Sequence, residues 1–345
     1  MKVAQSLFAA LLCAGLVSGA SAQELKLRLT VQTSTASPLG ANVVDYKNAV
    51  AEASKGAVAI EVFDKAQLFV DFKVPGAVGS GEIDMGVAQV GLYAADVPAV
   101  EIFQQPFLFD SDELTRAAAS PGSEIRKLID AQILAKTGAR VLYWQPYGLN
   151  LMMSKGTPLV SPQAMAGRNV RALDKGNAEF IALCGGKPEV ISGSKMLEAL
   201  SAGRVDSVMT GAIGIKEREL WRETQFVNRI RQSAILFVVI INEKVWQGLK
   251  PAQQALMQEQ ARKVEALYWD QFARMEQEAY RFAAEKGMTV KEMTSEDLSD
   301  WRVCSSELLE RFVEKLGETA AGLMSAYGKM RVALEKPDAK ATASK

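Results

Sequence analysis

The residues able to do chemistry in this chain are limited by the complete absence of histidine. Histidine is the usual general base beside a serine or cysteine nucleophile and the commonest metal ligand, so nucleophiles and metal sites of that kind are excluded. Carboxylates remain, and Asp64, Asp84 and Asp206 flank expected strand ends. Because paired acids can transfer protons, they leave open a secreted α/β enzyme acting on an organic acid, although no motif groups these three residues.

One basic residue stands in an apolar setting. Arg171 lies between Val170 and the pair Ala172-Leu173, within an expected strand where an unpaired charge is costly. A guanidinium presents a planar fork of donors that can grip a carboxylate through two hydrogen bonds. The residue types therefore allow two interpretations, an arginine that binds an acidic ligand and a structural arginine paired with Asp or Glu.

Two cysteines, Cys184 and Cys304, remain after the N-terminal segment. In an oxidising compartment they can pair, and Cys184 can equally be a small buried residue. Sequence alone does not decide connectivity, and for two cysteines this far apart we favour unpaired thiols. Without histidine to activate it, neither is expected to be a nucleophile.

Composition and charge describe an exported globular protein. The 345 residues carry 40 Lys+Arg and 40 Asp+Glu, so there is no basic excess to bind nucleic acid. Lys2, an apolar run over residues 7–17 and the small residues Ala20-Ser21-Ala22 are typical of a signal peptide cleaved before Gln23. We expect residues 1–22 to be removed, the protein to reach the periplasm without membrane insertion, and the tail 336–345 to be disordered.

The elements that must position these groups alternate between short strands and helices. Strands are expected at residues 25–30, 58–62, 83–88, 140–143, 170–173, 189–191, 205–210 and 233–241, with helices at 38–54 and 112–136 between them. This alternation predicts parallel-rich α/β sheets. From residue 251 to 286 one helical pattern would extend about 50 Å, enough to bridge two domains. The alternative is two shorter helices.

A short repeated motif suggests that the chain has two similar halves. Gly81-Glu82-Ile83-Asp84 and Gly203-Arg204-Val205-Asp206 share the form Gly-x-(Ile/Val)-Asp. Each follows an expected helix and opens a strand, and glycine can take the left-handed conformation that ends a helix. The recurrence fits a pair of α/β lobes.

A series of motifs follows in order along the chain. The first half contributes Phe-Asp-Lys-Ala-Gln-Leu at 63–68, Gly-Glu-Ile-Asp-Met at 81–85 and Gln-Pro-Phe-Leu-Phe at 105–109. The second contributes Met-Ala-Gly-Arg-Asn-Val-Arg at 165–171 and Ala-Leu-Ser-Ala-Gly-Arg-Val-Asp at 199–206. Asn242, Trp246, Leu249 and Gln253-Gln254 complete an order that extends over nearly the whole mature chain. In these motifs and their order the chain resembles the TRAP transporter solute-binding proteins, the DctP-like periplasmic receptor family.

The resemblance implies an α/β, two-lobed periplasmic binding protein of the Venus-flytrap type. Hinge strands and a long domain-bridging helix would join the lobes. We expect the first lobe to comprise residues 23–147 plus 236–272, and the second to comprise 148–235 plus 273–335.

The resemblance also implies that Arg171 holds the ligand carboxylate. Asn150 stands where many members carry a second arginine, Thr210 where many have asparagine, and Gly193 where an aromatic is often found. Gln89 falls where some members have a polar ligand contact. The aromatic candidates for pocket walls, each of which can instead be core packing, are Tyr93, Trp144, Tyr147 and Trp221.

These departures favour a monocarboxylate with a bulkier or less polar remainder over a sialic acid or dicarboxylate, unless a residue such as Arg231 supplies a second charge. The expected function is an extracytoplasmic receptor, acting as a monomer and without catalysis, that delivers a small organic acid to TRAP permease membrane subunits. No metal or organic cofactor is expected, because there is no cysteine cluster and no glycine-rich phosphate loop. The alternatives are the enzyme above and a ligand-sensing module.

Overall fold

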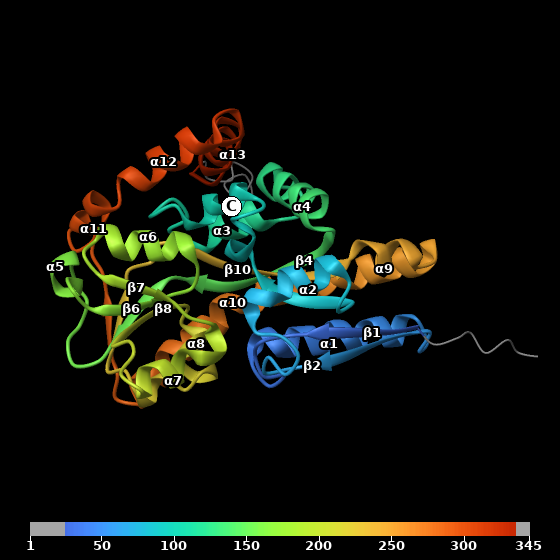
Figure 1. The fold of residues 1–345 in the computed structure, drawn as a ribbon, viewed down its shortest axis with the longest axis horizontal. Coiled ribbons are helices and arrows are strands. Elements are labelled where there is room, and N and C mark those ends of the chain that lie inside the picture. Colours follow the sequence, from blue (N-terminus) through green and yellow to red (C-terminus); the bar gives the residue numbers. More distant parts are fainter. Residues whose placement is uncertain (1–24, 336–345) are drawn as a thin grey trace, which may run out of the picture.

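The fold is described from a computed structural model over residues 25–335, and it contains two α/β halves that lie side by side (Figure 1). The expected signal peptide and C-terminal tail lie outside the described residues. The first sheet has strand order β2-β1-β3-β10-β4 and the second has order β11-β9-β5-β8-β6-β7. The α/β class and two-lobed architecture are therefore confirmed.

The first sheet is mixed. Strand β1 (Leu25–Thr30) pairs in parallel with β2 (Val58–Phe63) and β3 (Met85–Gln89), while β10 (Ala234–Asn242) runs antiparallel to β3 and β4 (Ala139–Leu149). All nine residues of β10 are buried, and its alternate side chains enter two different apolar clusters. A strand covered on both faces in this way reads as a continuous apolar run.

Helices cover this sheet where the sequence places their caps. Helix α1 (Pro38–Ala53) begins after Ser37, whose hydroxyl accepts from the Gly40 N–H. The single helix expected over 112–136 is wrong, because the structure has α3 (Asp112–Ala119) and α4 (Glu124–Thr137) with Ser120, Pro121 and Gly122 between them. Proline and glycine disfavour a continuous helix there. The other helical segments of this half are η1 (Asp71–Lys73), α2 (Val74–Ser80), η2 (Val90–Tyr93), η3 (Pro98–Gln104) and α9 (Glu243–Gly248).

The second sheet combines β5 (Leu151–Ser154), β6 (Asn169–Ala172), β7 (Lys187–Val190), β8 (Ser207–Thr210), β9 (Phe226–Arg229) and β11 (Thr289–Glu292). Strands β6, β7 and β8 are parallel, and β5 runs antiparallel to β8 and β9. Its helical segments are α5 (Pro162–Met165), α6 (Lys175–Leu183), η4 (Gly193–Lys195), α7 (Met196–Ser201), α8 (Ile213–Glu217) and η5 (Leu220–Arg222).

The repeated Gly-x-(Ile/Val)-Asp motif has the same structural role in both halves. Gly81 and Gly203 take positive φ values of 84° and 68° after α2 and α7. Asp84 accepts from the backbone N–H of Arg28 and Asp206 from that of Asn169, on the neighbouring strands β1 and β6. Each aspartate therefore ties a helix-to-strand turn to the next strand.

Helix α10 (Pro251–Glu285) is continuous over 35 residues and packs against β4 and α1 of the first half and α8 and β11 of the second. This confirms one long bridging helix rather than two shorter ones. The chain also crosses between the halves where β4 leads into β5 and where β9 leads into β10 (Figure 1).

The C-terminal helices extend across both halves. Helix α11 (Ser299–Cys304) contacts α5, whereas α13 (Glu318–Glu335), reached through α12 (Glu307–Leu316), packs on η3, α3 and α4 (Figure 1). Leu323 and Tyr327 join the apolar cluster of the first half, and the Tyr327 hydroxyl donates to the Leu108 carbonyl. We therefore propose that residues 318–335 belong to the first lobe rather than to the second; the other lobe boundaries stay a prediction.

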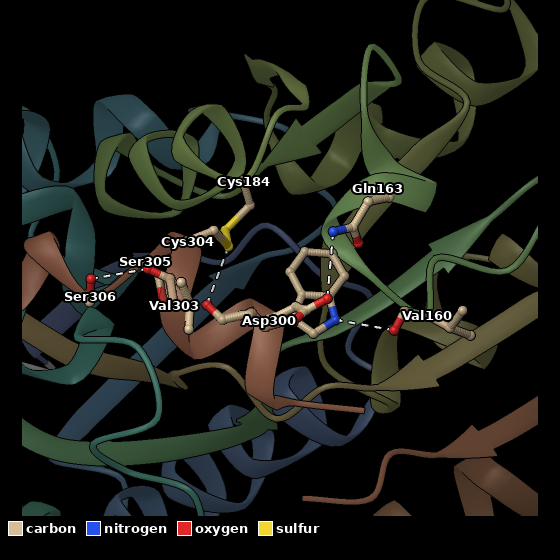
Figure 2. The surroundings of a disulfide bond; sticks show 9 residues. Val160, Gln163, Cys184, Asp300, Val303, Cys304, Ser305 and Ser306 are labelled. Atoms are coloured by element: carbon tan, nitrogen blue, oxygen red, sulfur yellow. Dashed lines mark hydrogen bonds between the residues drawn. A yellow bond between two sulfur atoms is a disulfide. The ribbon is translucent and has the colours of Figure 1, made fainter. Parts of the chain in front are cut away.

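The expectation of unpaired thiols is wrong, because Cys184 and Cys304 form a disulfide with a Cα–Cα distance of 5.1 Å (Figure 2). The bond joins the end of α6 to the end of α11. Beside it, the buried Trp301 stacks on Phe180 and donates from Nε1 to the Val160 carbonyl. Helix α11 is thus fixed by packing as well as by the covalent link.

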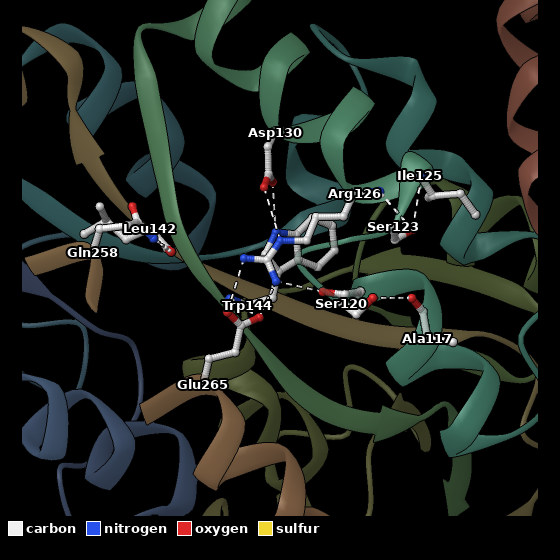
Figure 3. A network of polar contacts seen from close by, with 11 residues as sticks. Ala117, Ser120, Ser123, Ile125, Arg126, Asp130, Leu142, Trp144, Gln258 and Glu265 are labelled. Carbon is white, nitrogen blue, oxygen red and sulfur yellow. Dashed lines mark hydrogen bonds and ion pairs between the residues drawn. The ribbon is translucent and has the colours of Figure 1, made fainter. Parts of the chain in front are cut away.

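A buried ion pair fixes α10 to the first half. Arg126 on α4 is paired with Glu265 of α10 and with Asp130 at 3.2 Å (Figure 3). Glu265 also accepts from the Trp144 backbone N–H, and the indole Nε1 of Trp144 donates to Asp130. Burial is the largest influence on the pKa of both carboxyl groups and raises them, while Arg126 opposes that shift.

Candidate ligand-binding site

The principal candidate site is a cavity between the two halves, at the carboxyl ends of strands β1, β3, β6 and β8. Ligands of open α/β sheets bind at such strand ends. The cavity has a volume of about 20 Å³, little more than one water molecule requires. It is lined by Gln32, Asp71, Gln89, Leu92, Tyr147, Arg171, Leu173, Gly193, Met196, Thr210, Arg218, Ile235 and Phe237.

Arg171 is held rigidly in the cavity wall by backbone carbonyls. It is 3% exposed, its Nε donates to the Ile191 carbonyl at 2.8 Å and its Nη1 donates to the Met209 carbonyl at 2.8 Å. These bonds use two of the five guanidinium N–H donors. No carboxylate of residues 25–335 forms an ion pair with Arg171, so the interpretation as a structurally paired arginine does not hold within the described chain.

Burial and, next in size, the nearby positive charge of Arg218 together lower the pKa of Arg171 to about 10, while Asp71 and Asp174 act in the opposite sense. Arg171 therefore stays protonated at neutral pH. A buried cation with free donors is suited to an anionic group brought in from outside the chain.

A second arginine, Arg218, also lines the cavity and was missed in the sequence. It follows α8, and its Nη2 donates to Gln32 Oε1 at 3.3 Å and lies 3.7 Å from Glu217 Oε1. A Cβ on Gly193 would stand 2.9 Å from that Nη2 and 2.7 Å from Gln32 Oε1. Gly193, noted as a replaced aromatic, is therefore the residue that makes room for Arg218.

The expected alternative source of charge, Arg231, does not reach the cavity. It is partly exposed at the β9–β10 connection, with Nε 3.9 Å from Glu292. The expectation of a single arginine at the binding site is thus wrong, because Arg218 lines the cavity as a second cation.

Besides the bond from the Tyr147 hydroxyl on β4 to Glu217 on α8, three hydrogen bonds join the halves around the cavity. Asp71 on η1 accepts from the Gly193 N–H at 3.0 Å, and Gln89 Nε2 on β3 donates to Asp174 at 3.1 Å. The bond from Arg218 to Gln32 is the third. Because each joins a residue of the first half to one of the second, the conformation is a closed one.

Acidic groups near the arginines are deeply buried. Burial raises the pKa of Glu217, with Arg218 and the Tyr147 hydroxyl, which donates to Glu217 at 3.2 Å, acting against the rise. Burial likewise raises the pKa of Asp174, opposed by hydrogen bonds from Asn177 and Gln89. The site therefore combines two cations with carboxyl groups whose ionisation is disfavoured.

The structure brings four of the eight predicted site residues to the cavity, namely Arg171, Gln89, Tyr147 and Thr210. Asn150 lies elsewhere, donating to Asn177 and Ser233 beside the strand crossing. The pocket-wall interpretation fails for three aromatics. Tyr93 is buried in the core of the first half, Trp144 belongs to the Arg126 network, and Trp221 packs on Phe282 and Lys286.

The acids considered for catalysis are not brought together. Asp64 accepts from Thr35, Asp84 pairs with Arg28, and Asp206 pairs with Arg168. None of the three lines the cavity. Within residues 25–335 there is no cluster of three or more Cys, Asp or Glu side chains placed to hold a metal ion, and no helix has the length and apolar character needed to cross a membrane.

Two α/β halves, closed over a cavity that presents buried guanidinium groups, define the class of two-lobed solute-binding proteins. The chain belongs to the DctP family, the bacterial extracellular solute-binding proteins of family 7, which it matches over residues 30–316. The resemblance to TRAP solute receptors is thereby confirmed.

Known relatives are similar over most of their length. The C4-dicarboxylate-binding periplasmic protein DctP of Rhodobacter capsulatus is 25% identical, over 89% of this chain and 92% of that protein. A Bordetella pertussis extracytoplasmic solute receptor that binds pyroglutamic acid has a TM-score of 0.81 at 21% identity, covering 88% of this chain and 99% of that one. A marine metagenome TRAP protein specific for pyroglutamate has a TM-score of 0.83 at 19% identity, covering 89% and 99%. These relatives bind solutes, which supports a non-enzymatic role.

Proposed function

We propose that this protein is the extracytoplasmic receptor of a TRAP-type uptake system and that it binds a small monocarboxylate through Arg171. The observation that carries the proposal is a buried guanidinium, anchored by the Ile191 and Met209 carbonyls, with three N–H donors beyond those two bonds. Such a group is costly to bury alone and is stabilised when a carboxylate pairs with it. The relatives' organic acid ligands support the same chemistry.

Charge counting at the cavity supports one carboxylate rather than two. The lining side chains that carry formal charges are Arg171, Arg218 and Asp71, which sum to a single positive charge. Glu217, in contact with Arg218, reduces that charge further to the extent that it ionises. One carboxylate is therefore enough to neutralise the site, and a second would be buried without a matching cation.

Ligand entry requires the lobes to separate, because the closed cavity is small. Separation would break the hydrogen bonds of Asp71, Gln89 and Arg218 across the interface, and ligand binding would restore them. The closed form would then be the one that the permease membrane subunits recognise. In this proposal the protein is exported to the periplasm, loses residues 1–22 and acts as a monomer.

The test is isothermal titration with a panel of mono- and dicarboxylates on wild-type protein and Arg171→Lys. Lysine keeps the charge but loses the fork, so the best ligand should bind at least about 30-fold more weakly, as expected for a damaged buried charge pair. Native mass spectrometry of freshly purified protein identifies any acid that co-purifies.

Arg168→Ala is the matched control, because Arg168 lies on the same segment but pairs with Asp206 away from the cavity. It should leave the affinity unchanged. Equal affinity of wild type and Arg171→Lys, in protein that circular dichroism shows to be folded, would remove the central assignment. A preference for C4-dicarboxylates would overturn the monocarboxylate proposal.

A further inference from the structure

We propose that Arg218, admitted to the cavity by Gly193, binds a second and uncharged oxygen of the ligand. The receptor then selects monocarboxylates that also bear a hydroxyl or carbonyl oxygen. This inference rests on the proposed function and specifies the ligand class of the same site. Its basis is the hydrogen bond from Arg218 to Gln32 and the Arg218 Nε–H, which has no partner within residues 25–335.

Arg218 carries an unused donor in a dry position. Its side chain is 9% exposed and lines the cavity, yet among residues 25–335 its Nε–H has no hydrogen-bond partner. A buried donor without a partner is unfavourable. Because Nη2 is already bonded to Gln32, the guanidinium is oriented before the ligand arrives.

The surroundings of Arg218 favour a neutral acceptor over a second carboxylate. Glu217 Oε1 lies 3.7 Å from Nη2, and against the lowering effect of burial the pKa of Arg218 is raised first by the neighbouring Tyr147 hydroxyl, then by Glu217 and least by Asp71. Arg171, in contrast, forms no ion pair with a carboxylate of the described chain. The positive charge without a paired carboxylate therefore lies at Arg171. The charge of Arg218 is balanced by its acidic neighbours, so its contribution to the ligand is an oriented N–H donor.

Gly193 is the residue on which this arrangement depends. Any side chain there would place a Cβ 2.7 Å from Gln32 Oε1, 2.9 Å from Arg218 Nη2 and 3.0 Å from Arg218 Cζ. Contacts this short displace at least one partner. A larger residue at 193 would push the guanidinium out of the cavity. The position of the Arg218 side chain therefore depends on glycine at 193.

The experiment compares pairs of acids of which only one member carries a hydroxyl or carbonyl oxygen besides the carboxylate. The pairs are lactate and propionate, 5-oxoproline and cyclopentanecarboxylate, and galactonate and hexanoate, with succinate as the dicarboxylate. Titrations use wild type, Arg218→Met and Gly193→Ala. Gly76→Ala is the matched control, since a Cβ at Gly76 meets no atom within 4 Å.

In each pair of acids that the protein binds, wild type should prefer the oxygen-bearing member. Arg218→Met and Gly193→Ala should weaken binding of that member by about 10- to 100-fold, the usual effect of a hydrogen bond to a charged group. Its partner without the oxygen should lose only the smaller amount that the closing hydrogen bonds of Arg218 and Gly193 contribute, and Gly76→Ala should leave both unchanged. A purely structural role of Arg218 would weaken both members equally and would overturn the inference.

The outcomes also separate this inference from the function on which it rests. If acids bind through Arg171 but the oxygen preference is absent, or is the same in Arg218→Met, the inference alone fails. If succinate is the ligand most weakened in Arg218→Met, Arg218 is a second carboxylate clamp and the inference is overturned. If no acid of the panel binds, the proposed function fails and this assignment fails with it.

Discussion

Removing the disulfide between Cys184 and Cys304 should destabilise the protein without changing ligand affinity. The bond closes a loop across a sequence separation of 120 residues. The chain-entropy relation for a loop of that length gives about 5 kcal/mol at 25 °C, acting mainly through the unfolded state. With an unfolding entropy of about 2.1 cal/mol/K per residue over residues 25–335, this corresponds to a fall in Tm of roughly 7 °C.

The native state should tolerate the loss, because α11 keeps its other contacts. Trp301 is fully buried, its ring lies 5.9 Å from that of Phe180, and its Nε1 donates to the Val160 carbonyl at 3.3 Å. The disulfide does not line the ligand cavity. Affinity measured below the melting range should therefore stay at the wild-type value.

The assay is thermal unfolding followed by circular dichroism, with and without dithiothreitol, for wild type and the double variant Cys184→Ala/Cys304→Ala. The reductant should lower the wild-type Tm and leave the variant unchanged, which separates the bond from the loss of two sulfur atoms. Thiol titration should find no free thiol in the denatured, unreduced mature protein. A reduced wild type that melts at the same temperature as the oxidised protein would refute the reasoning.

Two further changes test buried charges. Glu265→Ala leaves Arg126 buried without its principal partner and should lower the free energy of unfolding, measured with urea, by about 3–5 kcal/mol. The double variant Arg126→Met/Glu265→Leu should recover most of this loss. A Glu265→Ala variant with unchanged stability would contradict the role of the pair. Burial raises the pKa of Glu276 from 4.5 to about 7, with Asp112 adding to the rise. Glu276 therefore contributes stability below pH 4.5 that is lost as pH rises to about 7, up to about 3 kcal/mol. Glu276→Gln should gain stability relative to wild type over that interval, and a difference that does not vary with pH contradicts the assignment.

The parts of the fold that could be predicted are those set by local patterning. Strand β10 is a continuous apolar run, and α10 has a helical period without an internal proline or glycine. Strand β4 is longer than the 140–143 expected, because it continues through Gln145, Pro146 and Gly148, and proline and glycine are unusual inside a strand. Gln145 is fully buried and donates to Asn42 and to the Leu39 carbonyl, partners more than 100 positions away. The alternation of apolar and polar residues that predicts a strand does not reveal a buried polar residue whose hydrogen-bond partners lie far away in the sequence.

Long-range partners also decide two further features that the local sequence leaves open. The sequence of α13 is rich in helix-forming Ala, Leu, Met and Glu, but it does not show which lobe covers its buried residues. Only the contacts of Leu323 and Tyr327 place it on the first half. The pairing of Cys184 with Cys304 depends in the same way on α11 returning to the end of α6, which no local signal encodes.

The two cavity arginines differ in how their function can be recognised. Arg171 carries a local signal, a charge inside an apolar strand, and the structure places it in the cavity wall. Arg218 follows Lys216 and Glu217 and precedes Glu219, so its neighbourhood is typical of a solvated helix end. It faces the cavity because Gly193 leaves the volume that an aromatic would fill. In the sequence the same glycine favours a ligand with a bulkier or less polar remainder, whereas in the structure its small size makes room for a cation. A substitution to glycine at a binding site therefore has to be judged by which neighbouring side chain occupies the released space.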